Sequence, residues 1–155
     1  MRVRINGMGR IGRLAAREAI GGIVRDGADP RAGNQLDIVH LNDIGGLDAT
    51  VHLLEFDSNH GRWRARFEPT ENCIDIDGRQ ISFTAEAKPE DVPWGEIGCD
   101  IVLECTGRFR TPETLAGYFE RGVKRVIFAA PVAAAEALNI VVGVNDSEYD
   151  PSRHN

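Results

Sequence analysis

Three glycines near the N-terminus have the spacing of a phosphate-binding turn. Gly7, Gly9 and Gly12 form a G-x-G-x-x-G pattern directly after the apolar run at residues 3–5. In such a turn the first glycine permits a tight strand-to-helix bend, the second lets backbone approach a pyrophosphate, and the third allows close helix–strand packing. The pattern also fits a plain turn in a chain with 17 glycines, so its interpretation depends on the surrounding elements.

A carboxylate follows the next apolar run. Asp43 comes after residues 37–41 and Asn42, 31 positions beyond Gly12. In dinucleotide-binding folds an acidic residue about 20 positions on accepts hydrogen bonds from the adenine ribose, and the polar stretch 27–35 accounts for the longer separation. A carboxylate here repels a 2′-phosphate, which favours NAD over NADP. The alternative is that Asn42 and Asp43 only cap the next helix.

The segment ECTGRF, residues 104–109, follows a third apolar run. Ligands bind at the carboxyl edge of open α/β sheets. There Thr106 offers a hydroxyl, Gly107 lets backbone approach, and Phe109 can border an aromatic ring. Taken alone, the segment is better explained as a plain strand-to-helix turn.

Two reactive groups are expected to be structural. Cys105 adjoins neither a helix N-terminus nor a histidine, so a small buried residue is favoured over a nucleophile. His60 has Asp57 nearby, but nothing supplies a third group to orient an acid–base dyad. The cysteines are widely spaced and include no C-x-x-C pair, which indicates a reducing compartment and no metal site.

The first half of the chain alternates between strand-like and helix-like segments. Residues 3–5 and 37–41 are apolar runs typical of buried strands. Two helices are predicted from apolar residues at helical spacing: Ile11, Leu14, Ala15 and Ala19, then Leu47, Val51 and Leu54. Alternation over residues 74–83, with Asp77-Gly78 near the centre, predicts an antiparallel hairpin with a type I′ turn.

The second half resumes the alternation. Residues 100–104 read as a buried strand, and Thr111 is the expected N-cap of a helix with Leu115 and Phe119 on its inner face, ended by Gly122. Further strands are predicted at residues 126–128 and 140–142. This order predicts an α/β fold with a doubly wound, mostly parallel sheet and an inserted β-hairpin.

Composition narrows the class of protein. The 155 residues suffice for one domain, and 18 basic against 24 acidic residues give a net charge of −6, which argues against a nucleic-acid partner. A membrane-spanning helix needs about 20 consecutive apolar residues, and no stretch of the sequence approaches this length. We expect a cytoplasmic protein with a small-molecule partner.

Several phrases resemble the N-terminal part of glyceraldehyde-3-phosphate dehydrogenase. They are INGMGRIGR, HLNDIGG, LLEFDSNHGRW, EDVPWGEIGCDIVLECTGRF, GVKRVIFAAP and IVVGVNDSEYDP. The resemblance covers essentially all 155 residues and implies a Rossmann-type NAD-binding domain. It places Arg10 and Ile11 on the pyrophosphate, Asp43 on the adenine ribose beside Asn42, and Thr106, Gly107 and Phe109 along the cofactor. Asn145 matches a position near the junction with the catalytic half.

Two departures concern the cofactor contacts. An arginine that the family often carries near adenine is missing from Glu86-Ala87-Lys88-Pro89, and Lys88 is a substitute one position along. The family's Ser-Ala-Pro is Ala129-Ala130-Pro131 here, which removes a hydroxyl near the nicotinamide.

The resemblance implies a phosphorylating aldehyde dehydrogenase that transfers a hydride from a phosphorylated aldehyde to NAD, usually as a homo-tetramer. The family's nucleophilic cysteine motif would follow residue 155, so residues 1–155 are expected to be the NAD-binding domain, with no catalytic residue and no activity alone. Alternatives are an erythrose-4-phosphate dehydrogenase, an arsenate-linked variant of the family, or a stand-alone non-catalytic NAD-binding module.

Overall fold

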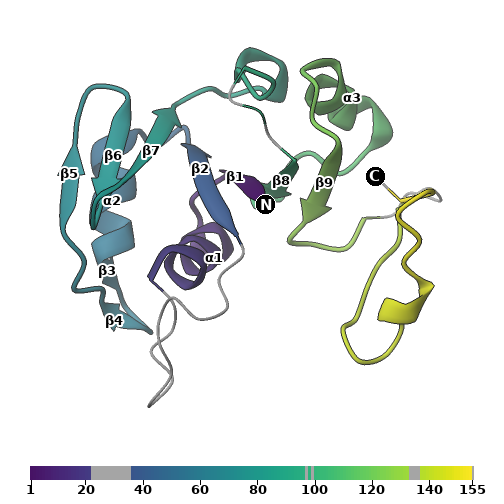
Figure 1. Cartoon of the computed structure of the whole chain (residues 1–155), viewed down its shortest axis with the longest axis horizontal. Coiled ribbons are helices and arrows are strands. Elements are labelled where there is room, and N and C mark those ends of the chain that lie inside the picture. The colour runs from purple at the N-terminus through teal and green to yellow at the C-terminus, as the bar shows by residue number, and fades with distance from the viewer. Residues whose placement is uncertain (22–35, 97, 99, 133–136, 155) are drawn as a thin grey trace.

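One large, mostly parallel β-sheet forms the centre of the protein (Figure 1). The computed structural model describes residues 1–21, 36–96, 98, 100–132 and 137–154, and the loop predicted at residues 27–35 lies outside them. The strands of the large sheet are β1 (Arg2–Asn6), β2 (Asp37–Asn42), β5 (Phe67–Pro69), β6 (Cys73–Ile76), β7 (Arg79–Thr84), β8 (Ile101–Glu104) and β9 (Arg125–Phe128). Their order across the sheet is β5-β6-β7-β2-β1-β8-β9, and β3 (Phe56–Asp57) pairs with β4 (Gly61–Arg62) in a separate two-stranded sheet.

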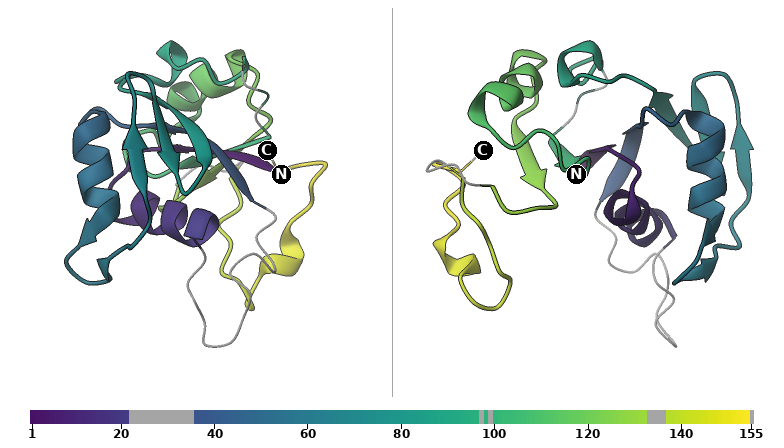
Figure 2. Two further views of the ribbon diagram at one scale, coloured as in Figure 1. Left: turned by 60° about the vertical axis from the view of Figure 1, so that its left-hand side comes forward. Right: turned by 180° about the vertical axis from the view of Figure 1, so that it is seen from behind.

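The strand directions confirm the predicted fold class. Strands β7, β2, β1, β8 and β9 are mutually parallel, and β5 and β6 are antiparallel to their neighbours. The helices are α1 (Arg10–Gly21), α2 (Leu47–Glu55) and α3 (Pro112–Glu120), with short 3-10 helices η1 (Pro89–Asp91) and η2 (Asp146–Glu148). Helices α1 and α3 lie on opposite faces of the sheet (Figure 2).

The inserted hairpin is formed by β6 and β7 as predicted. Asp77 and Gly78 at its tip have φ angles of 53° and 84°, and positive φ at both central residues is the requirement of a type I′ turn. Strand β7 continues from this hairpin into parallel pairing with β2, so the hairpin is joined to the parallel sheet through β7.

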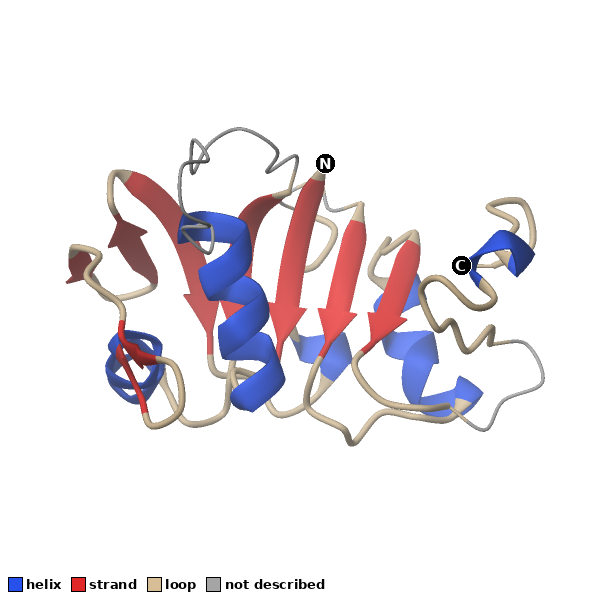
Figure 3. Cartoon of the chain, turned by 90° about the horizontal axis from the view of Figure 1, so that it is seen from below, coloured by secondary structure: helices blue, strands red, loops and turns tan. Residues whose placement is uncertain are grey.

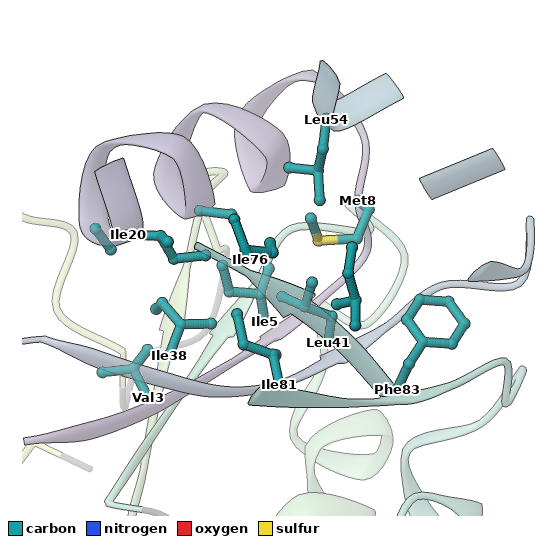
Figure 4. Close-up of a cluster of buried hydrophobic side chains, with 13 residues drawn as sticks. Val3, Ile5, Met8, Ile20, Ile38, Leu41, Leu54, Ile76, Ile81 and Phe83 are labelled. Atoms are coloured by element: carbon teal, nitrogen blue, oxygen red, sulfur yellow. The ribbon is translucent and has the colours of Figure 1, made fainter. Parts of the chain in front are cut away.

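Two apolar cores lie on the two sides of the sheet. The first packs α1 and α2 against the sheet through buried aliphatic side chains (Figure 4). It contains Val3 and Ile5, whereas the side chains of the alternate residues Arg4 and Asn6 are also buried but lie on the other face of β1. The second core gathers Val92, Trp94, Val102, Tyr118, Val123 and Val126. Each such side chain contributes about 1.5–3 kcal/mol on burial.

Thr111 is the N-cap of α3, as predicted, and its N–H donates to Thr114 Oγ1 at 3.1 Å. The prediction for the inner face of this helix was wrong at Phe119, which is 41% exposed, while Tyr118 is fully buried. The reason is a specific partner: the Tyr118 ring packs against the Trp94 ring, with centroids 5.4 Å apart. The inward stripe of α3 therefore runs through Leu115 and Tyr118.

The strand predicted at residues 140–142 was also wrong. This apolar run enters a turn in which the N–H groups of Val144 and Asn145 donate to the carbonyl of Val141 at 2.9 and 3.1 Å. Val142 is 86% exposed. The Asn145 side chain stabilises the turn, because its Oδ1 accepts from Val141 N–H and its Nδ2 donates to the Asn139 carbonyl. Local hydrogen bonds thus replace strand pairing.

Over the described ranges, no helix has the length and apolar character needed to cross a bilayer.

Candidate functional site

The glycine turn between β1 and α1 is shaped by close backbone contacts. Gly7 has a φ of 90°, and a Cβ there would lie 2.7 Å from the Thr106 amide nitrogen. A Cβ on Gly12 would lie 2.0 Å from the Gly7 carbonyl oxygen. A Cβ on Gly9, in contrast, would meet no atom within 4 Å. Gly7 and Gly12 are therefore required by packing, and Gly9 leaves open space beside the backbone.

Helix α1 begins at Arg10, directly after that open space. Its first intrahelical bond is donated by Arg13 N–H to the Gly9 carbonyl at 3.0 Å. The amides of the first turn have no intrahelical acceptor and carry the positive end of the helix dipole. Arg10 and Ile11 are exposed at this end. The turn fits a pyrophosphate, because amide donors and an unobstructed Gly9 meet there.

A cleft of about 210 Å³ opens at the carboxyl edge of the sheet. The arrowheads of the parallel strands all end at this edge (Figure 3). The cleft is lined by Asn6, Gly7, Gly9, Asn42, Asp43, Ile44, Glu86, Ala87, Cys105, Thr106, Arg108 and Phe109. Strand β1 has β2 on one side and β8 on the other, so the cleft lies where ligands bind in open α/β sheets.

Asp43 lies at the edge of the cleft and fastens the glycine turn. Its Oδ2 accepts the Met8 N–H at 2.6 Å, and its Oδ1 accepts the Gly45 N–H at 2.7 Å. The residue before helix α2 is Gly46, so neither Asn42 nor Asp43 occupies the N-cap position of that helix. The capping alternative is wrong, because Ile44, Gly45 and Gly46 separate Asp43 from the first residue of the helix.

Beneath the cleft lies a buried carboxylate, Glu104, which is 3% exposed. Its Oε1 accepts the N–H of Thr106 at 2.7 Å and the Thr106 hydroxyl. Its Oε2 accepts Asn6 Nδ2–H at 2.9 Å and the Tyr118 hydroxyl. Burial and the neighbouring Glu104 charge raise the pKa of Tyr118 well above its ordinary value, so the phenol remains a donor.

Cys105 lines the cleft as a protonated thiol. Burial, with the Glu104 charge as a second cause, raises the pKa of Cys105 to about 12. Because the thiolate is the nucleophilic form, this agrees with the structural role expected of Cys105.

The cleft brings together half of the predicted site residues. The predicted residues that line it are Gly7, Gly9, Asn42, Asp43, Thr106 and Phe109, and those outside its lining are Arg10, Ile11, Gly12, Lys88, Gly107 and Asn145. Lys88 is exposed just beyond Ala87, and Asn145 lies in the turn after β9.

Six cleft-lining residues were not among the predicted site residues: Asn6, Ile44, Glu86, Ala87, Cys105 and Arg108. Asn6 carried a usable signal, because it ends the first strand directly before the glycine turn. Glu86 and Ala87 follow β7. The sequence predicted β7 only as part of a hairpin and did not predict that it pairs in parallel with β2, so these two residues were not expected at the carboxyl edge.

His60 and Asp57 lie at the connection between β3 and β4 and are hydrogen-bonded to each other. Asp57 Oδ1 accepts the His60 N–H at 2.9 Å and His60 Nδ1 at 3.0 Å, and Asp57 Oδ2 pairs with Arg13 Nη2 at 3.3 Å. The hydrogen bonds from His60 hold the pKa of Asp57 well below its usual range. Among the described side chains, no group of three or more potential metal ligands gathers.

Comparison with known proteins finds one matching family and many relatives. Residues 1–112 match the family described as "Glyceraldehyde 3-phosphate dehydrogenase, NAD binding domain". The chain is 52% identical over 155 residues to glyceraldehyde-3-phosphate dehydrogenase 3 of Nostoc sp., covering 99% of this chain and 42% of that protein. It is 42% identical over 154 residues to glyceraldehyde-3-phosphate dehydrogenase of Geobacillus stearothermophilus, with coverage of 99% and 42%. The chain thus spans about two fifths of the length of these relatives.

Proposed function

The chain belongs to the glyceraldehyde-3-phosphate dehydrogenase family through its NAD-binding domain, and from this we propose that it supplies the cofactor half of a phosphorylating aldehyde dehydrogenase. Its cofactor is NAD. The observation that carries the proposal is the glycine turn: a Cβ would clash at Gly7 and Gly12 but would meet nothing at Gly9. This is the pattern of packing and open backbone that a pyrophosphate requires.

We assign the residues of the site by their positions around the cleft. The amides of Gly9, Arg10 and Ile11 bind the pyrophosphate, because they form the free first turn of α1. Asp43 accepts the adenine ribose hydroxyls, with Asn42 beside it.

The remaining assignments concern the cofactor's outer contacts. Thr106, Gly107 and Phe109 follow the cofactor from the β8 side, and Lys88 approaches the adenine from the exposed segment after β7. Asn145 belongs to the surface that meets the catalytic half.

In the whole enzyme, we propose, an aldehyde of a phosphorylated substrate is oxidised to an acyl phosphate, and the nicotinamide of NAD accepts the hydride. Residues 1–155 bind and orient the cofactor. We assign them no catalytic residue. Burial beside Glu104 raises the pKa of Cys105, the thiol that lines the cleft, to about 12. We further propose that residues 1–155 act as one NAD-binding domain, that the whole enzyme is a cytoplasmic homo-tetramer, and that this chain alone does not oxidise the aldehyde.

The test is calorimetric titration of the chain with NAD. We expect measurable but weak binding to the wild type, since the family's pocket is completed by the catalytic half. Gly9→Ala should weaken binding at least about tenfold, equivalent to about 1.4 kcal/mol, because its methyl group occupies the space left for the pyrophosphate. The melting temperature of the Gly9→Ala variant should equal that of the wild type, because the added methyl group meets no protein atom within 4 Å. A wild type without NAD binding, or a Gly9→Ala variant that binds equally well, would contradict the proposal.

Asp43 sets the expected preference between NAD and NADP. Asp43→Asn removes the negative charge that repels a 2′-phosphate, so the ratio of NADP to NAD affinity should rise about tenfold. Glu55→Asn, which removes a carboxylate outside the cleft lining, is the matched control. An unchanged ratio in Asp43→Asn would remove this carboxylate from the ribose site.

A further inference from the structure

We propose that Glu104 is a positioning residue of the cofactor cleft, whose buried carboxylate fixes both walls of the cleft through hydrogen bonds. This inference rests on the proposed NAD site. Thr106, which lines one wall, is held directly, because both its N–H and its hydroxyl donate to Glu104 Oε1. Its oxygen accepts in turn from the Arg108 N–H at 3.1 Å, so the loop after β8 is tied back to one carboxylate oxygen.

The opposite wall is held through two asparagines. Asn6 Nδ2 donates to Glu104 Oε2 at 2.9 Å, and Asn6 Oδ1 accepts Asn42 Nδ2–H at 2.7 Å. The Asn42 amide then bonds both backbone groups of Glu86: its Nδ2 donates to the Glu86 carbonyl at 3.0 Å, and its Oδ1 accepts the Glu86 N–H at 2.9 Å. The chain of bonds thus runs from the loop after β8 to the segment after β7, beneath the cleft.

The arrangement requires a carboxylate and not an amide. Each oxygen of Glu104 accepts two hydrogen bonds. Oε1 accepts from the Thr106 N–H and the Thr106 hydroxyl, and Oε2 accepts from Asn6 Nδ2–H and the Tyr118 hydroxyl. An ionised carboxylate accepts about four hydrogen bonds and donates none. In Glu104→Gln one oxygen becomes an NH₂ group that faces two donors, so Asn6 or Thr106 must turn away.

The Glu104 carboxyl group is nearly fully buried, and these four hydrogen bonds satisfy both of its oxygens. Hydrogen bonds to charged groups are the strong ones in proteins, so they hold Asn6, Thr106 and Tyr118 in single orientations. Both residues that reach the cleft, Asn6 and Thr106, are thereby arranged before the cofactor arrives, which lowers the entropy cost of binding.

The test is NAD affinity, measured by calorimetry well below the melting temperature of each variant. Glu104→Gln should weaken NAD binding about tenfold, whereas Glu55→Gln, a carboxylate outside the cleft lining, should leave the affinity unchanged. A double-mutant cycle with Thr106→Val decides whether Glu104 acts through Thr106. The losses should be non-additive, with the double variant little weaker than Glu104→Gln alone.

A merely structural role would lower the melting temperature of Glu104→Gln without changing the affinity of the folded protein, and that result would overturn the proposal. Additive losses in the cycle would overturn it as well. If Glu104→Gln does not fold, Tyr118→Phe provides the comparison. It removes one donor to Glu104 Oε2 at a residue outside the cleft lining, so NAD should bind more weakly, and an affinity equal to that of the wild type would overturn the proposal. A wild type that does not bind NAD contradicts the proposed function itself, whereas unchanged binding by a folded Glu104→Gln contradicts this inference alone.

Discussion

Acidification should destabilise the fold through one buried histidine. His40 on β2 is 1% exposed, and its ring nitrogens lie 2.7 Å from Ser82 Oγ and 2.9 Å from Thr84 Oγ1. The Trp94 ring packs edge-on against it at 5.8 Å. Burial, with the Arg4 charge as a second cause, lowers the pKa of His40 from 6.5 to about 4. The neutral imidazole is therefore the native form.

The magnitude follows from the difference in proton binding. The unfolded chain takes up a proton at His40 near pH 6.5, and the folded chain does so only near pH 4. The stabilising contribution is therefore complete above pH 6.5 and is lost as the pH falls through the window from 6.5 to 4. Relative to pH 7, the loss at pH 5 is about 2 kcal/mol, and it approaches about 3 kcal/mol below pH 4.

The assay is urea unfolding between pH 7.5 and pH 4.5, followed by circular dichroism, on the wild type and on His40→Gln. The variant is less stable at neutral pH, but its free energy of unfolding lacks the His40 term. The difference between the two proteins should therefore shrink by about 2 kcal/mol between pH 7 and pH 5. Subtraction also removes the shared contributions of the other histidines and of the carboxylates. Parallel pH profiles for the two proteins would refute the assignment of the buried neutral imidazole.

Three substitutions test the packing of the fold. Gly12→Ala places a methyl group 2.0 Å from the Gly7 carbonyl oxygen, so the melting temperature should fall by about 6 °C, corresponding to about 2 kcal/mol; an unchanged melting temperature would show that the turn can relax. Trp94→Phe removes the indole N–H that donates to the Pro89 carbonyl at 2.7 Å, and the free energy of unfolding in urea should fall by about 2 kcal/mol. Arg17→Met removes hydrogen bonds to the carbonyls of residues 54, 55 and 61, so amide exchange should accelerate in β3 and β4 but not in α3; uniform acceleration would contradict a local role.

The order of elements was predictable because each one carries its own local signal. The hairpin at Asp77-Gly78 required only alternation and a turn that demands positive φ. Residues 140–142 were wrongly predicted as a strand from their apolar composition. That composition does not distinguish a strand from a turn that the Asn145 side chain stabilises. Phe119 was misplaced because two neighbouring helical faces were both apolar, and contact with Trp94 selected Tyr118.

The cleft was only partly predictable for a different reason. Its glycines and Asp43 belong to a short pattern that can be read along the chain. The bond between Asn6 and Glu104 joins residues 98 positions apart, and it becomes visible only once β1 is known to lie beside β8. The partners of polar side chains at strand ends can therefore be predicted only when the order of the strands in the sheet is known.

Because Gly7 packs closely against the Thr106 backbone, the conformation of the glycine motif depends on residues outside the motif. Its first glycine is constrained by the segment that follows the neighbouring strand β8, and its Met8 amide is held by a carboxylate from a third segment. A graft of residues 1–21 onto another parallel sheet would carry the glycines without the surroundings that bend them. For protein engineering, the transferable unit is the trio of strand ends at β1, β2 and β8, not the nine-letter phrase INGMGRIGR.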